Sequence, residues 1–155
     1  MATVSILPDG YRLRSGDRKD LYLLIDFLEN TYRELFPGQS QLAHLTHTVK
    51  AYFSPETPLW FVDKEIDRTV ACLWMGKAVD QSNGAQYGHI FLVYVKPSDR
   101  HQGLATALLN EAKMWSESKG QTQLGLQVFI ANQPALNLYE KLGFQTQSVL
   151  MVKRL

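Results

Sequence analysis

The chain has 155 residues, 45% of them apolar and 20% charged, which is the composition of an ordinary soluble globular protein. Its 16 basic and 15 acidic side chains give a formal net charge of +1, so no strong field would attract nucleic acid or an anionic membrane. No apolar stretch approaches the roughly 18 residues of a membrane span. The one cysteine, Cys72, excludes an internal disulfide and fits a reducing compartment. Since no leader pattern is found at the N-terminus, we expect a cytoplasmic protein with a single domain over residues 1–155.

Apolar periodicity and turn residues predict the elements along the chain. In the first half we expect a strand at 11–14, helices over 18–36 and about 41–53, and strands near 59–66 and 69–79. In the second half we expect a strand near 86–95, a helix from 103 to about 118, a strand over 124–130, a short helix over 133–142 and strand material from 144 to 155. Antiparallel strands followed by strand–helix–strand indicate a mixed α+β fold with a parallel pair late in the chain.

The most informative segment joins a buried strand to a helix. The apolar run Ile90–Val95 passes through Lys96–Asp99 into the sequence Arg100–Thr106, which contains Gly103. A glycine-bearing turn at a helix start leaves backbone N–H groups free, and these donors together with the helix dipole suit a pyrophosphate. Taken alone, the pattern Arg-x-x-Gly-x-Ala is short, and a strand-to-helix connection with one glycine for tight packing explains it equally well.

A second motif, read with the first, identifies a family. Val95-x-Pro97 and Arg100-x-x-Gly103-x-Ala105 are followed by the run Asn132-x-x-Ala135-x-x-Leu138-Tyr139-Glu140-Lys141-Leu142-Gly143-Phe144. In this order and spacing the two motifs resemble the GNAT superfamily of N-acetyltransferases, over about 86–155. The N-terminal half agrees only in the order of its elements. The resemblance implies a GNAT-like central, mostly antiparallel sheet with a splayed parallel pair, flanked by about four helices.

The resemblance also implies an acetyl-CoA site. Backbone amides of the turn would hold the pyrophosphate, main-chain groups of the strand end would pair with the pantetheine arm, and Asn132 would contact the pantetheine side. Without the resemblance, Asn132 is a turn residue ahead of a helix whose first turn contains proline. The residues assigned to the coenzyme in this way are Val93, Tyr94, Val95, Arg100, His101, Gln102, Gly103, Leu104, Ala105, Thr106, Asn132 and Tyr139.

Two residues are candidates for proton transfer. Tyr139 stands where the family often has a tyrosine that protonates the departing thiolate, although its place on an apolar helical stripe would equally suit a core tyrosine. Some relatives carry a glutamate eleven positions before the signature Gln/Arg, and this chain has His89 there. An imidazole titrates near pH 6.5 when unperturbed, so His89 is a candidate base; a strand histidine of intermediate burial is the alternative.

Three further residues invite a chemical reading that the sequence does not support. His44 and His47 lie three apart on a predicted helix, but no cysteine or clear carboxylate partner is near them, so we expect surface histidines and no metal. Cys72 lies in the middle of a predicted strand and is expected to be a small core residue rather than a nucleophile.

The sequence therefore predicts an acetyl-CoA-dependent N-acetyltransferase that transfers an acetyl group directly to a primary amine, either a small amine or an amine of a peptide or protein. The alternative is a catalytically weak acyl-CoA-binding sensor or interaction module. The tail after Gly143-Phe144 is short and leaves little room for a long hairpin loop over the acceptor side. We therefore expect an open acceptor cleft, which a second subunit of a homodimer could complete.

Overall fold

Five strands form one sheet in the order β1-β2-β3-β4-β5 in the computed structural model, which describes residues 6–155. The strands are β1 (Tyr11–Ser15), β2 (Leu59–Lys64), β3 (Thr69–Val79), β4 (Gln86–Val95) and β5 (Leu124–Leu126). The helices are α1 (Leu21–Leu35), α2 (His44–Tyr52), α3 (Leu104–Ser118) and α4 (Gln133–Lys141), with short 3₁₀ turns η1 (Arg18–Asp20) and η2 (Pro97–Asp99). Neighbouring strands are antiparallel except β4 and β5, which are parallel. The predicted α+β class with a late parallel pair is confirmed.

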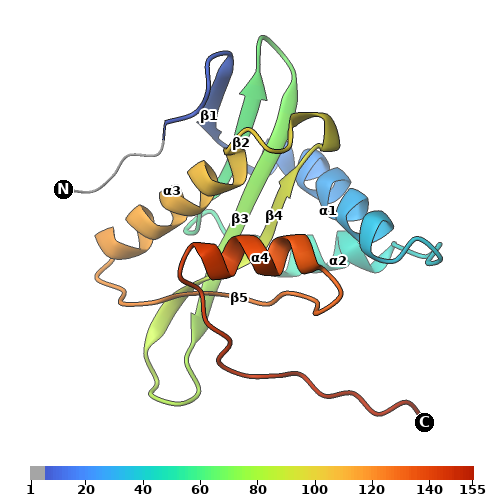
Figure 1. Cartoon of the computed structure of the whole chain (residues 1–155), viewed down its shortest axis with the longest axis vertical. Helices are drawn as coiled ribbons and strands as arrows, with labels where there is room; N and C mark the ends of the chain where they lie inside the picture. The colour runs from blue at the N-terminus through green and yellow to red at the C-terminus, as the bar shows by residue number, and fades with distance from the viewer. Residues whose placement is uncertain (1–5) are drawn as a thin grey trace.

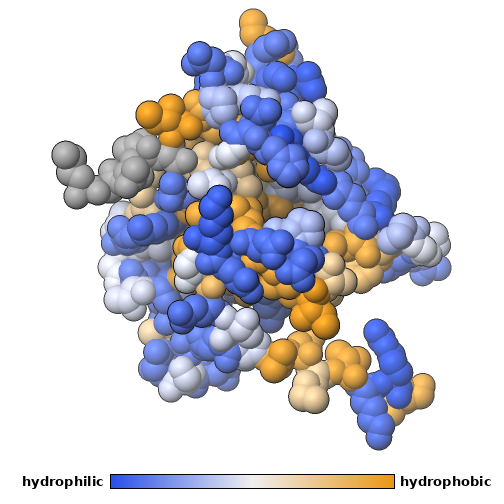
Figure 2. Space-filling model, in the orientation of Figure 1, coloured by the Kyte–Doolittle hydropathy of each residue, from blue (hydrophilic) through white to orange (hydrophobic). Residues whose placement is uncertain are grey.

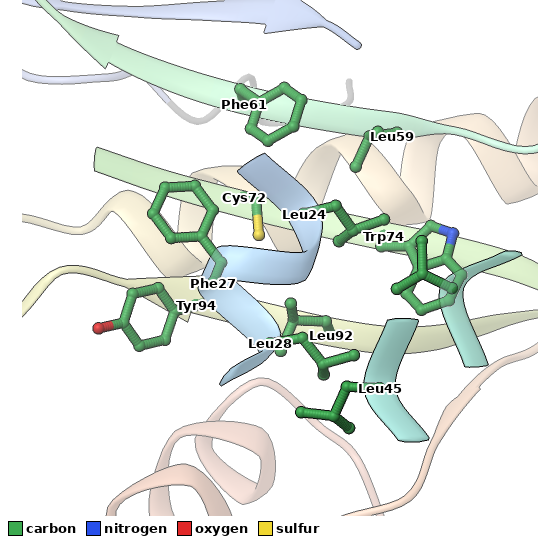
Figure 3. Close-up of a cluster of buried hydrophobic side chains, with 11 residues drawn as sticks. Leu24, Phe27, Leu28, Leu45, Leu59, Phe61, Cys72, Trp74, Leu92 and Tyr94 are labelled. Carbon is green, nitrogen blue, oxygen red and sulfur yellow. The ribbon is translucent and has the colours of Figure 1, made fainter. Parts of the chain in front are cut away.

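Helices cover both faces of the sheet: α1 and α2 pack on one face, and α3 and α4 lie over the other (Figure 1). Under α1 and α2 lies a cluster rich in aromatic side chains, shown in Figure 3. Its members are Leu24, Phe27, Leu28, Leu45, Val49, Leu59, Phe61, Cys72, Trp74, Leu92 and Tyr94. The α3 face is mostly aliphatic, with Leu104, Leu108 and Ala112 of α3 against the alternate side chains of β3 and β4. None of the helices in the described range is long and apolar enough to cross a membrane.

Several predicted elements are shorter in the structure. The helix predicted over 18–36 is divided into η1, which Asp17 opens with a capping box, and α1. The helix predicted over 41–53 begins at His44. The strand predicted over 124–130 ends at Leu126, and residues 144–155 form no strand. Among the described residues, neither 127–130 nor 144–155 is paired with a strand, and alternation of side chains cannot substitute for a ladder.

A β-bulge determines where β4 and β5 part. Trp74 of β3 faces Leu92, but the next residue, Met75, faces Ile90, so Phe91 is the extra residue of β4. β5 pairs with β4 only before this point, over Gly88–Ile90. Beyond the bulge, β4 continues to Val95 with no strand on its β5 side among the described residues. This opening is the splay that the resemblance to the family implies.

A buried carboxylate fixes the turn that leaves β4. Asp99, at the end of η2, is fully buried; it accepts hydrogen bonds from the hydroxyls of Tyr11 (2.9 Å) and Ser98 (3.0 Å). Lys64 Nζ and Arg68 Nη2 lie 3.5 and 3.6 Å from its two oxygens. Burial alone would raise the Asp99 pKa, but these hydrogen bonds and charges hold the pKa below its ordinary value. The network ties η2 to β1, β2 and the β2–β3 turn.

We predict that Asp99→Asn destabilises the fold by about 3 kcal/mol at pH 7, because the two cations lose their buried counter-charge. A carboxylate with a lowered pKa stabilises the fold above the unfolded-state pKa of about 3.9 and loses this effect as pH falls through the folded-state value. The difference between wild type and variant in urea unfolding should therefore shrink below about pH 4. The control is Asp9→Asn, an exposed aspartate; an equal loss there would contradict the assignment.

Candidate active site

The start of α3 presents backbone donors that the described chain does not use. His101 and Gly103 both have positive φ, 62° and 80°, and Gly103 precedes the helix with no side-chain cap. The first bond of the helix runs from the Ala107 N–H to the Gly103 carbonyl at 3.0 Å. No described residue accepts a hydrogen bond from an amide between His101 and Thr106. A Cβ added to Gly103 would meet no atom within 4 Å. The predicted turn is therefore open, with free donors at the positive end of a helix.

Arg100 anchors this turn to the rest of the fold. Its Nε donates to the Val95 carbonyl at 2.9 Å, and its Nη2 lies 2.8 Å from both carboxylate oxygens of Glu34 on α1. The guanidinium also lies over the Tyr94 ring, 5.6 Å from its centre. Arg100 was assigned to the coenzyme from its place in the motif, which stays a prediction; in this structure its Nε and Nη2 are bound to protein groups. An open cleft beside this anchor is lined by Asn30, Arg33, Glu34, Tyr94, Lys96, Pro97 and Ser98.

The end of β4 offers main-chain groups on its open side. Lys96 N–H donates to the Val70 carbonyl of β3 at 2.8 Å, and hydrogen-bonded pairs alternate along an antiparallel ladder. The groups of Tyr94 therefore point to β3, whereas those of Val93 and Val95 point to the side where β5 has ended. Since Arg100 occupies the Val95 carbonyl, the Val93 N–H and C=O and the Val95 N–H are the groups open to a ligand.

The side chain of Tyr94 lies on the α1–α2 face of the sheet, whereas the side chains of Val93 and Val95 lie on the α3 face. Its ring packs in the α1–α2 cluster, and its hydroxyl donates to Glu34 at 3.3 Å. Burial, with the Glu34 charge, raises its pKa to about 12. The Tyr94 side chain therefore packs in the core and contacts both members of the Arg100–Glu34 pair.

Tyr139 of α4 lies on the α3 side of the sheet. Its ring packs against the aliphatic cluster and meets the edge of Phe144, with ring centres 5.7 Å apart. Burial raises its pKa to about 12, so the phenol is protonated at neutral pH. Its hydroxyl donates to no described residue. The ring is therefore a core ring, as one reading of the sequence expects, and the role of its hydroxyl as a proton donor stays a prediction.

Asn132 caps α4. Its side-chain oxygen accepts from the Ala135 N–H at 3.4 Å, and its own N–H donates to the Phe129 carbonyl at 2.9 Å. This is the turn function that the sequence alone predicts. The cap fixes where α4 begins, and so helps to place Tyr139 two turns later.

His89 lies on the other face of the sheet, among aromatic rings. Phe91 and Tyr87 meet its ring edge-on, with centres 5.2 and 6.1 Å away. Its cross-strand neighbours are glycines, Gly76 on β3 and Gly125 on β5. Burial lowers the pKa of His89 below 6.5, and its Nδ1 is buried without a partner. The imidazole is therefore neutral at pH 7 and could accept a proton.

The packing of the Tyr87 and Phe91 rings around His89 was not predicted from the sequence. A Cβ on Gly76 would lie 2.3 Å from the Phe91 ring, and one on Gly125 would lie 2.5 Å from the Tyr87 ring. At both positions a side chain would clash with the aromatic ring that packs over the glycine from the neighbouring strand. Period-2 alternation could have suggested that Tyr87, His89 and Phe91 share a face, but nothing in the sequence states which glycines they cover.

Cys72 lies in the core and His44 and His47 lie at the surface, as the sequence analysis expects for these side chains. Cys72 is fully buried, and burial raises the pKa of its thiol well above the ordinary value. His44 meets the Tyr32 ring edge-on, with centres 5.9 Å apart. Within residues 6–155, no three His, Cys, Asp or Glu side chains are grouped so that they could hold a metal ion.

Comparison with known proteins shows the family of the chain. A model of the acetyltransferase (GNAT) family matches residues 25–144, well over half of the chain. An N-alpha-acetyltransferase of Sulfurisphaera tokodaii is 29% identical over 144 residues, which cover 90% of this chain and 83% of the relative.

Solved structures share the fold at low identity. A putative acetyl transferase from Pyrococcus furiosus matches with a TM-score of 0.79 at 19% identity, covering 94% of this chain and 99% of its own. A predicted acetyltransferase with acetyl-CoA from Clostridium acetobutylicum matches with a TM-score of 0.74 at 18% identity, covering 93% and 96%. At such identities the likeness concerns the fold.

We predict that Gly103→Ala weakens coenzyme A binding about tenfold or more, because a methyl group would enter the open space over the free amides and the residue would resist its positive φ. The matched control is Gly120→Ala at the other end of α3, where φ is 74° and the space is equally open. Both variants should lose about 1 kcal/mol of stability, whereas titration calorimetry should show weaker binding only for Gly103→Ala. Equal affinity in the two would contradict a pyrophosphate site here.

Proposed function

The chain belongs to the acetyltransferase (GNAT) family and is an N-acetyltransferase, and we propose that it transfers the acetyl group of acetyl-CoA directly to a primary amine. The observation that carries this proposal is the row of amides from His101 to Thr106 that no described residue uses. These amides follow the end of β4, and the bulge opens the edge of β4 that faces β5.

The binding roles follow from which groups are free. We assign the pyrophosphate to the amides of the turn, where the helix dipole favours an anion by roughly 0.3–1 kcal/mol and by up to about 2 when partly buried. The pantetheine arm would lie along β4 and pair with the open groups of Val93 and Val95 as an added strand does. Arg100, Glu34 and Asp99 would act at one remove, by holding the turn and the strand end in place.

The chemistry follows from the two faces of the sheet. The acyl donor supplies a thioester, whose carbonyl carbon is attacked and whose thiolate leaves. We assign Tyr139, on the α3 face, to donate its proton to that thiolate, and His89, on the α1–α2 face, to accept a proton from the amine directly or through water. A β4 amide near Val93–Val95 would stabilise the oxyanion, a contribution typically worth about 3–4 kcal/mol. The proton donor Tyr139 and the proton acceptor His89 would then act on the splay from opposite faces of the sheet.

An α-amine suits this site better than a lysine side chain. At pH 7 an α-amino group with a pKa near 7.7–8.0 is neutral roughly 10–15% of the time, whereas a lysine amine is neutral about once in 2,500 molecules. A buried imidazole with a lowered pKa is a weak base, and it can serve only an acceptor that is already partly neutral. The name of the Sulfurisphaera tokodaii relative, an N-alpha-acetyltransferase, supports the same acceptor class.

Incubation with acetyl-CoA and an amine panel tests the proposal. The panel holds a free peptide N-terminus, the same peptide with its N-terminus blocked and a lysine present, and a small polyamine; thiol release is followed for each. We expect release with the free N-terminus and far less with the blocked peptide. Binding of acetyl-CoA without release on any amine would favour the sensor reading instead, and no binding below millimolar concentration would contradict both.

We predict that Tyr139→Phe lowers kcat about a hundredfold, the usual contribution of a positioned proton donor, while acetyl-CoA affinity stays within about twofold because the ring and its packing remain. Steady-state kinetics on the amine found above, with calorimetry on acetyl-CoA, measures both. Tyr22→Phe is the control, since Tyr22 is 69% exposed on α1. An unchanged kcat in Tyr139→Phe would remove this hydroxyl from the reaction.

A further inference from the structure

The β5–α4 segment, residues 124–146, is held to the body of the molecule by few interactions. β5 pairs with β4 through three residue pairs, and none of the side chains of the segment is fully buried. Figure 2 shows hydrophilic surface on the outer face of α4. The segment nevertheless carries Tyr139 and forms the far side of the opening between β4 and β5. A segment with so few buried contacts is among the first parts of a fold to open.

One carboxylate contacts the chain at both ends of this segment. Asp80, in the turn between β3 and β4, accepts a hydrogen bond from Gln123 Nε2 at 3.0 Å, just before β5 begins. Its two oxygens lie 3.3 and 3.4 Å from Gln147 Nε2, just after the segment ends. Among the described residues, these are the side-chain hydrogen bonds that join 121–155 to the rest of the fold. The chain therefore leaves Asp80 before β5 and returns to it after α4, at the base of the β3–β4 hairpin (Figure 1).

Asp80 is itself firmly placed in the turn. Its side chain is buried and accepts from the Ser82 hydroxyl at 2.6 Å and from the Ser82 N–H at 2.8 Å. Its carbonyl accepts from the Gly84 N–H at 2.7 Å, which closes the turn. The hydrogen bonds to the carboxylate, that of the Ser82 hydroxyl first, hold the pKa of Asp80 well below its ordinary value. The carboxylate is therefore ionised at neutral pH, and hydrogen bonds to an ionised acceptor are stronger than those between neutral groups.

The turn alone does not require the two glutamines. Ser82 caps the carboxylate locally, as a serine two residues after an aspartate commonly does in a turn. Gln123 and Gln147 come from positions 43 and 67 residues away in the sequence. The feature that they share is that they lie on either side of the β5–α4 segment. Their contacts with one ionised group therefore fix the two ends of the segment against the β3–β4 hairpin.

We propose that Asp80 is a positioning residue for the transfer reaction: it holds the β5–α4 segment, and with it Tyr139, at a fixed distance from a thioester bound along β4. Gln123 and Gln147 are the two points at which it does so. This inference rests on the proposed function, in which the Tyr139 hydroxyl is the proton donor to the leaving thiolate. A misplacement of about 1 Å between reacting groups can cost roughly a hundredfold in rate, so a looser segment would slow the reaction while the fold stays intact.

The effect of Asp80 is expected on the chemical step and not on coenzyme binding. The pyrophosphate is assigned to the amides from His101 to Thr106, and Asp99 and Arg100 hold that turn. Asp80 lies beside the other end of β4, where Val79 of β3 pairs with Gln86, and its side chain bonds only to Ser82, Gln123 and Gln147 among the described residues. Loss of its contacts would leave the turn that follows β4 as it is.

Hydrogen exchange measured by mass spectrometry gives the first test. In Gln147→Ala we expect the amides of β5 and α4 to exchange about fivefold faster, the change expected when one hydrogen bond of ordinary strength is lost. Gln147 is exposed, and its removal leaves the Ser82 contacts of Asp80 in place. Gln145→Ala, at an exposed position two residues earlier, is the matched control and should exchange like wild type. Asp80→Asn should act in the same direction as Gln147→Ala. Equal exchange in the two alanine variants would overturn the proposal.

A double-mutant cycle separates positioning from stability. We expect Gln147→Ala to lower kcat about fivefold and to leave acetyl-CoA affinity within about twofold of wild type. In the Tyr139→Phe background, where the hydroxyl is already absent, the same substitution should change kcat by less than about twofold. An equal loss in both backgrounds would show that the contact acts through stability alone and would overturn the positioning role. If Tyr139→Phe itself leaves kcat unchanged, the proton-donor assignment fails; hydrogen exchange, which needs no activity, still decides whether Asp80 holds the segment.

Discussion

The first turn of an α-helix has donors that the helix cannot satisfy, and the candidate site is built around that constraint. The amides from Gly103 to Thr106 have no partner within the helix. His101 and Gly103 have positive φ, and a Cβ added at Gly103 would meet no atom within 4 Å. In most helices a serine, threonine or aspartate at the cap would satisfy such donors. Here a glycine stands at that position, so the donors stay available to an anion.

Free donors are useful only if they are held still, and the surrounding residues do this through charge. Arg100 joins the turn to Glu34 on α1 and to the carbonyl of Val95, while Asp99 joins η2 to the first two strands. The two networks begin at the adjacent residues Asp99 and Arg100; one reaches β1 and β2, and the other reaches α1. The turn therefore keeps its shape without using its own amides, which a cap would have required.

Much of this could be predicted from the sequence, and the rest could not for physical reasons. The turn at Gly103, the helix that follows and the place of Tyr139 depend on local patterns, so short motifs reveal them. Glu34 lies 66 residues from Arg100, and no spacing rule links the two. Likewise, alternation in 124–130 and 144–155 predicts strands, but a strand exists only where a partner lies alongside. The bulge at Phe91 ends the pairing of β5 with β4 at Leu126, and 144–155 pairs with no strand among the described residues.

Burial acts on both candidate proton carriers and moves each away from its ordinary pKa. The Tyr139 phenol, with its pKa raised to about 12, is a poorer acid than a phenol in water, whose pKa is near 10. Yet a thiolate formed in the same apolar surroundings would also have a raised conjugate pKa, since burial disfavours every anion. The difference in pKa between the Tyr139 phenol and the thiol that it forms is therefore smaller than the raised pKa of the phenol alone suggests. Each unit of that difference costs about 1.4 kcal/mol. His89 is moved in the complementary direction, since burial keeps it neutral. Burial thus leaves the phenol protonated and the imidazole neutral at pH 7, which are the states that the roles proposed for Tyr139 and His89 require.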